Sequence, residues 1–171
     1  METTADFERW SPKKLDETAH AEASDLVNRG ARMTQIRAVY SAVQRMRTVQ
    51  RVRQDQGRAA DEVRAELTRH LIFFKPRLAY AAARHKELRG LQQFLTGKID
   101  EVLQSSAFGR ALENFFVLME SLVAYFYYEG EKSKDAGAHT RPSGPEQRGG
   151  AHRAQVQQAP RGATRSEQRN G

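Results

Sequence analysis

The chain contains no cysteine among its 171 residues, so it can form neither a disulfide framework nor a zinc site with thiolate ligands. It also lacks an apolar run long enough to span a bilayer, and its first residues lack the pattern of a signal peptide. We therefore expect a cytoplasmic protein that does not associate with a membrane.

Sequence motifs of common enzyme classes are missing as well. The chain has no dinucleotide-binding fingerprint, no phosphate-binding P-loop, no nucleophile elbow and no HExxH zinc motif. Glu17 and His20 have the Glu-x-x-His spacing of di-iron bundles, but such sites need a second copy of the motif, which this sequence lacks. The sequence thus predicts no enzymatic activity, no metal site and no cofactor.

Large apolar residues disappear after Tyr128. Beyond it the chain has no Leu, Ile, Phe, Met, Tyr or Trp and a single Val, so it cannot bury enough apolar surface to offset the entropy of ordering it. We expect a disordered low-complexity tail over residues 130–171. Residues 1–10 are expected to be flexible, although Phe7 and Trp10 could attach them to the folded part. The folded domain is then residues 11–129.

Apolar residues recur at helical spacing through this domain. The most regular series alternates steps of four and three residues, and it consists of Phe108, Leu112, Phe115, Met119, Leu122 and Phe126. Phe116 and Val123 widen this seam, so the last helix is expected to lie in the middle of a bundle. No alternating strand pattern occurs. The predicted fold class is all-α, a small helical bundle of about five helices followed by the disordered tail.

Cap residues predict the first two helices. The first should cover residues 12–29 after an N-cap at Ser11, and its few large apolar residues suggest that it packs weakly or at the periphery. The second should begin after a cap at Thr34 and end near Gly57, with Val39 and Met46 on its apolar side.

Proline and glycine predict the remaining boundaries. A third helix should be broken or restarted at Pro76, and the next segment should run from there to about Leu95 and break near Gly97. A short helix over residues 98–104 would follow. Ser105 or Ser106 is then expected to cap the last helix.

Acidic residues are absent from residues 34–54, which carry five arginines: Arg37, Arg45, Arg47, Arg51 and Arg53. The whole chain has a net charge of +7, whereas residues 1–128 hold 20 Lys and Arg against 16 Asp and Glu, or +4. The positive excess of the folded part is therefore concentrated in one helix, and a polyanion is the natural partner.

Two interpretations of this helix remain open. Arg37, Gln44, Thr48 and Arg51 fall near one line on its surface, opposite Val39, which makes a polar stripe. The stripe could be no more than a solvated face. It could also follow the phosphates of a nucleic acid through forked, charge-assisted hydrogen bonds. Tyr80 adds an aromatic ring near basic residues, and a tyrosine of the core is favoured over one that stacks on a base.

Three segments together resemble the small subunit of type III-A CRISPR effector complexes, the Csm complexes. They are Thr34, Gln35, Ile36 and Arg37 with Val39, Tyr40 and Val43; residues 75–84, KPRLAYAAAR; and residues 116–125, FVLMESLVAY. Their order and spacing all match, and the middle segment is the most specific. The resemblance covers about residues 12–128, so it leaves the tail unexplained.

The resemblance implies an all-helical, non-catalytic protein present in several copies. These copies stack along the guide–target RNA duplex, between the Cas10-type large subunit and the guide-binding backbone subunits. It also implies contact with the RNA backbone, for which Arg37 and Arg84 are the first candidates. Second candidates are Arg45, Arg47, Arg51, Lys75 and Arg77.

A structural role for Arg84 and two other functions for the protein remain open. Arg84 could instead hold Glu120 across the bundle, and Glu120 itself is expected to be a structural acid paired with an arginine. A stand-alone helical DNA-binding regulator is the alternative function, because Gly30 precedes the arginine-rich helix in the manner of a helix-turn-helix motif. A metal-dependent enzyme built on a helical bundle is the third function considered.

Overall fold

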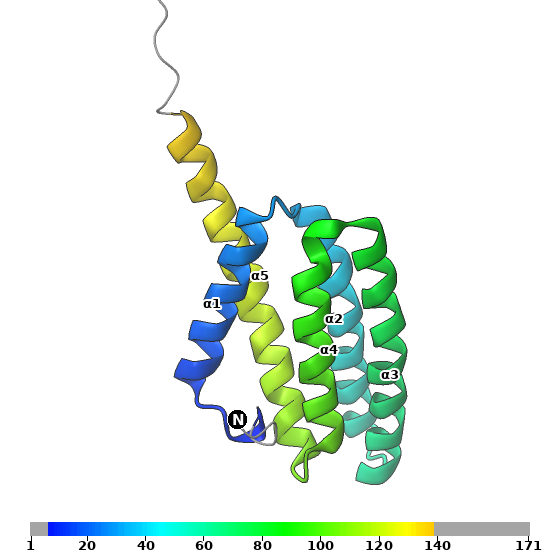
Figure 1. Cartoon of the computed structure of the whole chain (residues 1–171). Coiled ribbons are helices and arrows are strands. Elements are labelled where there is room, and N and C mark those ends of the chain that lie inside the picture. The colour runs from blue at the N-terminus through cyan, green and yellow to red at the C-terminus, as the bar shows by residue number, and fades with distance from the viewer. Residues whose placement is uncertain (1–6, 139–171) are drawn as a thin grey trace, which may run out of the picture. The chain divides into compact units, whose positions relative to one another are not determined.

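The computed structural model describes residues 7–138 of the chain (Figure 1). Within this part it contains five α-helices, two short 3₁₀ helices and no strand, which confirms the all-α prediction. None of these helices is long and apolar enough to cross a membrane. The elements are η1 (Phe7–Arg9), α1 (Pro12–Asn28), α2 (Met33–Asp55), α3 (Ala60–Arg84), η2 (Lys86–Leu88), α4 (Arg89–Gln104) and α5 (Phe108–Ala138).

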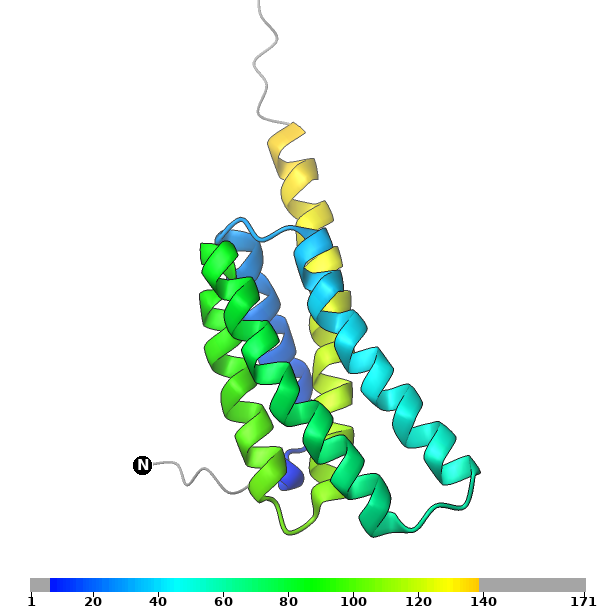
Figure 2. The same cartoon turned by 90° about the vertical axis from the view of Figure 1, so that its right-hand side faces the viewer.

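Helix α5 is the central element of the bundle. It packs against α1, α2 and α4, while α3 covers the far side by packing against α2 and α4 (Figures 1 and 2). Phe115, Met119 and Leu122 are fully buried, and Phe116 is almost so. The predicted apolar seam of the last helix and its central position are both confirmed.

Helix α5 is longer than the sequence predicted. It continues to Ala138, so residues 130–138 are helical and do not belong to a tail that begins at residue 130. In both ribbon views its last turns extend past the ends of the other helices (Figures 1 and 2). The rest of the predicted tail, residues 139–171, and the first six residues of the predicted flexible N-terminus lie outside the described residues.

Helix α1 packs closely along α5, which corrects the expectation of weak packing. It begins as predicted, because the Ser11 hydroxyl accepts a hydrogen bond from the backbone N–H of Lys14 at 3.2 Å. Ala19 and Ala23 are completely buried, one helical turn apart. Small side chains allow two helix axes to approach each other closely, so few large apolar residues do not mean a weak contact.

The start of α2 lies two residues before the predicted one. The helix begins at Met33 after Arg32, whose backbone N–H donates to the Gln35 side-chain oxygen at 2.8 Å. Gln35 therefore satisfies the backbone donor of the cap residue, and Thr34 lies within the first turn and is not the cap. The end of α2 is as predicted, since Gly57 adopts a positive φ of 68° after the last turn.

Two predicted helix breaks are wrong. Helix α3 runs through Pro76, whose exposed position on the solvent face lets water reach the carbonyl that the proline leaves unpaired. Helix α4 runs through Gly97, since the buried residues Leu95 and Ile99 hold the helix on either side. The real break lies between these points, at His85, where the backbone is extended.

The segment before α1 is anchored rather than loose. Phe7 is buried, and its carbonyl accepts a hydrogen bond from the Asn114 side chain at 2.8 Å. Ser105 donates to the carboxylate of Glu8 and accepts from the N–H of Ala107 at 3.0 Å, so it links this segment to the start of α5. The proposed role of Phe7 as an attachment point is confirmed. Ser105 does not cap the last helix as expected, because it ends α4, and α5 begins at Phe108 after Ala107.

Enlarging a buried alanine of α1 should destabilise the bundle. Ala23→Leu is expected to lower the free energy of unfolding by about 1–3 kcal/mol, because three extra carbons must be placed in a packed helix contact. Urea denaturation followed by circular dichroism measures the change. Ala21→Leu is the matched control on the exposed side of α1 and should have little effect. Equal stability of the Ala23 variant would contradict the packing described above.

Removal of residues 139–171 should leave the bundle as stable as the full chain. The buried apolar residues of the described part end at Phe126, so the deletion takes nothing from this core. Thermal unfolding of the two chains, monitored by circular dichroism, should give the same midpoint. A loss of cooperative unfolding in the shorter chain would show that the bundle depends on the deleted residues.

Candidate nucleic-acid interface

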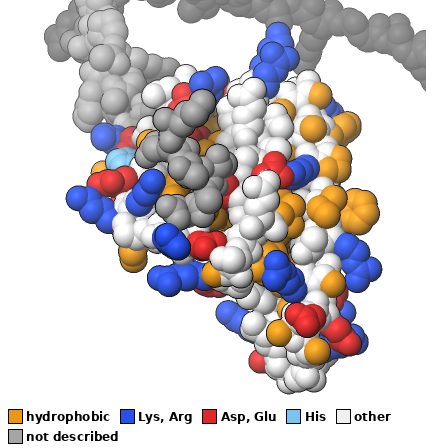
Figure 3. All heavy atoms as spheres, turned by 60° about the horizontal axis from the view of Figure 1, so that its bottom comes forward, with side chains coloured by type: hydrophobic (Ala, Val, Ile, Leu, Met, Phe, Trp, Pro, Cys, Tyr) orange, Lys and Arg blue, Asp and Glu red, His pale blue; other side chains and the backbone are white. Residues whose placement is uncertain are grey.

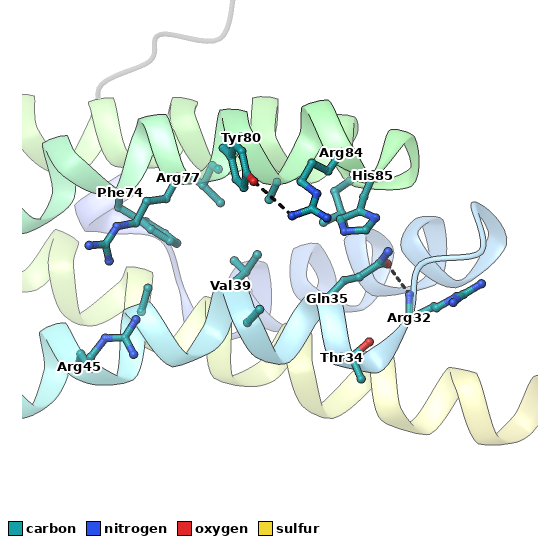
Figure 4. A pocket seen from close by; sticks show the side chains of 15 residues that line it. Arg32, Thr34, Gln35, Val39, Arg45, Phe74, Arg77, Tyr80, Arg84 and His85 are labelled. Carbon is teal, nitrogen blue, oxygen red and sulfur yellow. Dashed lines mark hydrogen bonds between the residues drawn. The ribbon is translucent and has the colours of Figure 1, made fainter. Parts of the chain in front are cut away.

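Helices α2 and α3 run antiparallel and leave a groove between them (Figure 4). We call this the α2/α3 groove. Its floor is apolar and consists of Ala38, Val39, Ala42, Phe74, Leu78, Ala81 and Leu88. Its walls carry the cationic side chains of Arg32, Arg45, Arg77 and Arg84. A second hollow adjoins it along the same two helices and shares Arg45 and Arg77.

No aspartate or glutamate of the described residues lines either hollow. Glu87 does not line the groove, but its carboxylate accepts a hydrogen bond from the lining residue Gln35 at 2.9 Å. Its own backbone amide and the Gln35 side chain lower the pKa of Glu87, so it is ionised at neutral pH. The arginines along the groove therefore meet no acid within it, and their charges add to a positive potential.

The groove arginines keep their hydrogen-bonding groups available. Arg45 and Arg77 are exposed and form no ion pair with another described residue. Arg84 donates to the Tyr80 hydroxyl at 3.2 Å, and its guanidinium lies 5.7 Å from the centre of the Tyr80 ring. The proposed pairing of Arg84 with Glu120 is therefore wrong.

Two aromatic side chains of α3 are exposed beside these arginines. Tyr80 lines the α2/α3 groove and Phe73 lines the adjoining hollow, and each is 65% exposed. The expectation that Tyr80 belongs to the core is therefore wrong. Figure 3 shows hydrophobic side chains gathering on the α3 side of the molecule with Lys and Arg side chains among them.

Three basic residues, two of α2 and one of α3, are held by acids of other helices. Arg47 donates to Glu120 at 2.7 Å and to Glu113 at 3.2 Å, and the hydrogen bond to Glu120 is the main cause that raises the pKa of Arg47. Arg53 makes a forked pair with Glu66, and Lys75 pairs with Asp100. Glu120 is thus a structural acid paired with a bundle arginine, as predicted.

The remaining candidates, Arg37 and Arg51, lie outside the α2/α3 groove. Arg37 is exposed about 80° around the helix from Arg45. Arg51 lies on the side of α2 that faces α5, in a shallow hollow that also contains Arg47 and Glu120. The arginines of α2 therefore do not all lie on the side of the helix that lines the groove. Of the predicted residues, it brings Arg45, Arg77 and Arg84 together.

Of the predicted Glu-x-x-His pair, His20 takes part in a contact between α1 and α5, whereas Glu17 lies 3.7 Å from Lys13 of its own helix. His20 lies 3.0 Å from the Glu129 carboxylate and stacks on Tyr125 at 4.5 Å, and its hydrogen bond lowers the pKa of Glu129. Tyr125 donates to Asp16 at 2.6 Å. Among the described residues, no group of three or more His, Asp and Glu could hold a metal ion.

The sequence analysis missed Arg32 and Phe73 as members of this surface. Arg32 precedes α2, so the periodicity of that helix gave no information about it. Phe73 does carry a signal, because it lies seven residues before Tyr80 and off the buried series of Leu71, Phe74 and Leu78. That spacing places both rings on one exposed side of α3.

Comparison with known proteins gives one match. No curated protein and no solved structure matches the chain. The model of the family described as Csm2 Type III-A matches residues 9–132, which include α1 to α4 and most of α5. This match covers more than half of the chain and agrees with the resemblance of its three motifs. The chain therefore belongs to the Csm2 Type III-A family and is a small subunit of a type III-A CRISPR complex.

Proposed function

We propose that this small subunit binds the backbone of the guide–target RNA without sequence preference, through the α2/α3 groove, and has no catalytic activity. The observation that carries the proposal is the convergence of Arg45, Arg77 and Arg84 from two helices on a groove without a carboxylate. Guanidinium groups match phosphate oxygens through forked hydrogen bonds, and their charge does not depend on pH in the physiological range.

Phosphate contacts suit a subunit of an RNA-guided complex. They fix the position of a protein on a strand but carry no sequence information, and base pairing between guide and target supplies the specificity. One copy with about three phosphate contacts would bind weakly at physiological salt. Several copies stacked along one strand would bind strongly, since each bound copy raises the effective concentration of the next.

We assign different roles to the remaining candidates. Arg37 and Arg51 are exposed, and we propose that they add backbone contacts outside the groove. Arg47 and Lys75 are engaged by carboxylates of α5 and α4, and we propose that they stabilise the bundle instead. The family supports the Cas10-type large subunit, the guide-binding backbone subunits and further copies of this chain as protein partners.

Charge reversal in the groove should weaken RNA binding. Arg45→Glu, Arg77→Glu and Arg84→Glu should each lower the affinity for a single-stranded RNA by about tenfold, because a charge-assisted phosphate contact is lost. For three contacts the slope of log affinity against log salt should be near −2, at roughly −0.7 per phosphate, and each substitution should flatten it. Fluorescence anisotropy at several salt concentrations measures both quantities.

Arg110→Glu is the matched control for these variants. It makes the same change of charge at an exposed residue in the first turn of α5, outside the groove, where a negative charge also suits the helix dipole. If this control weakened binding as much as the groove variants do, the effect would reflect total charge only. Helix content should be unchanged in every variant, since Arg84 has no carboxylate partner whose loss could destabilise the bundle.

Binding should be equally strong for strands of different sequence. The alternative function, a DNA-binding regulator, needs a helix that enters the major groove. Helix α2 is poorly placed for this role, because it packs against both α3 and α5 and buries Ile36, Val39, Val43 and Met46. Competition between RNA strands of different sequence and duplex DNA tests the point. Preference for one DNA sequence would favour the regulator and contradict the proposal.

A further inference from the structure

Contacts with RNA phosphates do not explain why Tyr80 is exposed in the α2/α3 groove. A phosphate needs only the arginines, yet the groove also presents a largely exposed phenol ring above an apolar floor. Figure 4 shows this ring on the side of α3 that faces α2, next to Arg84. Three floor residues are alanines, namely Ala38, Ala42 and Ala81, so the two helices leave space beneath the ring.

The Tyr80 ring is held in place before any ligand arrives. Arg84, one turn further along α3, donates a hydrogen bond to its hydroxyl at 3.2 Å. A side chain that is already ordered loses less conformational entropy when a ligand packs against it. The ring is therefore a preorganised flat surface beside three cationic side chains.

We propose that the α2/α3 groove holds one unpaired base of the RNA strand, stacked on Tyr80, while Arg45 and Arg77 bind the neighbouring phosphates. The identity of the polymer rests on the function proposed above. Stacking of a base on an aromatic side chain tolerates every base, because each base has a π face. The site would therefore distinguish unpaired from paired nucleotides and would still show no sequence preference.

The chemistry of the groove favours a nucleotide over a protein segment. A peptide that filled the apolar floor would have to offer several acidic groups to the surrounding arginines, since the lining provides no carboxylate to neutralise them. A nucleotide combines a flat, largely apolar base with an adjacent anionic phosphate. This combination matches an exposed ring, an apolar floor and free guanidinium groups within one groove.

The test compares two strands that carry the same charge. The full chain is titrated with a 15-nucleotide oligouridylate and with an abasic ribose-phosphate strand of equal length, and binding is followed by fluorescence anisotropy. Wild-type protein should bind the base-bearing strand about tenfold more tightly. Tyr80→Leu should abolish this preference and leave the affinity for the abasic strand unchanged. Tyr80→Phe keeps the ring and should retain most of the preference.

Phe73→Leu is the matched control, because Phe73 is equally exposed on the same helix but lies outside the α2/α3 groove. It should keep the preference for bases. Equal binding of the two strands by wild-type protein, or a preference that survives Tyr80→Leu, would overturn the stacking proposal. So would a Tyr80→Leu variant that binds RNA normally but fails to assemble with the protein subunits, which would make the groove a protein-docking surface.

The two proposals fail in different ways. If only the stacking proposal is wrong, both strands still bind in a salt-dependent manner, and Arg45→Glu still weakens this binding. If wild-type protein bound neither strand, or if the groove arginines could be reversed without effect, the proposed backbone contact would fail and the stacking proposal with it.

Discussion

Burial of the aromatic seam of α5 is the constraint on which the rest of the structure depends. Phe115, Phe116 and Met119 can leave water only if other helices surround α5, and α1, α2 and α4 do so. Helix α1 achieves this with small residues, which bring its backbone close to α5. With α5 surrounded by α1, α2 and α4, helix α3 packs on α2 and α4 instead. The groove between α2 and α3 is a consequence of this arrangement.

The same arrangement sorts the basic residues. The side of α2 that faces α5 meets Glu113 and Glu120, which engage Arg47. The side that faces α3 meets Arg77 and Arg84. Acids of α5 therefore neutralise Arg47, whereas Arg45 meets no acid in the groove toward α3, and Arg53, nearer the end of α2, pairs with Glu66 of α3. The helices that pack around α2 therefore decide which of its sides keeps an unpaired positive charge.

Membership of the Csm2 Type III-A family gives this surface a context. Under the proposed function, a small subunit of an RNA-guided complex does not need to distinguish sequences, and a groove of arginines with an apolar floor would provide affinity without such discrimination. The contact of α1 with α5 through His20, Tyr125 and Glu129 lies on other helices. That contact stabilises the bundle and leaves the α2/α3 groove open.

Local periodicity and cap residues were enough to predict several elements from the sequence. The seam of α5, the Ser11 cap, the end of α2 at Gly57 and the all-α class all follow from residue spacing and backbone preference. The three motifs also sufficed to identify the family. Local signals failed at Pro76 and Gly97, because buried residues on both sides of each position favour a continuous helix more strongly than one residue disfavours it.

Which charged and aromatic residues are available to a partner depends on how the helices pack. Helical periodicity places Arg47 and Arg45 on α2 but cannot show that acids of a distant helix engage the first and not the second. The sequence likewise predicted that Tyr80 belongs to the core, whereas the position of α3 at the edge of the bundle exposes it. Ion pairing and exposure depend on residues far apart in the chain, and a single sequence does not state which of them meet.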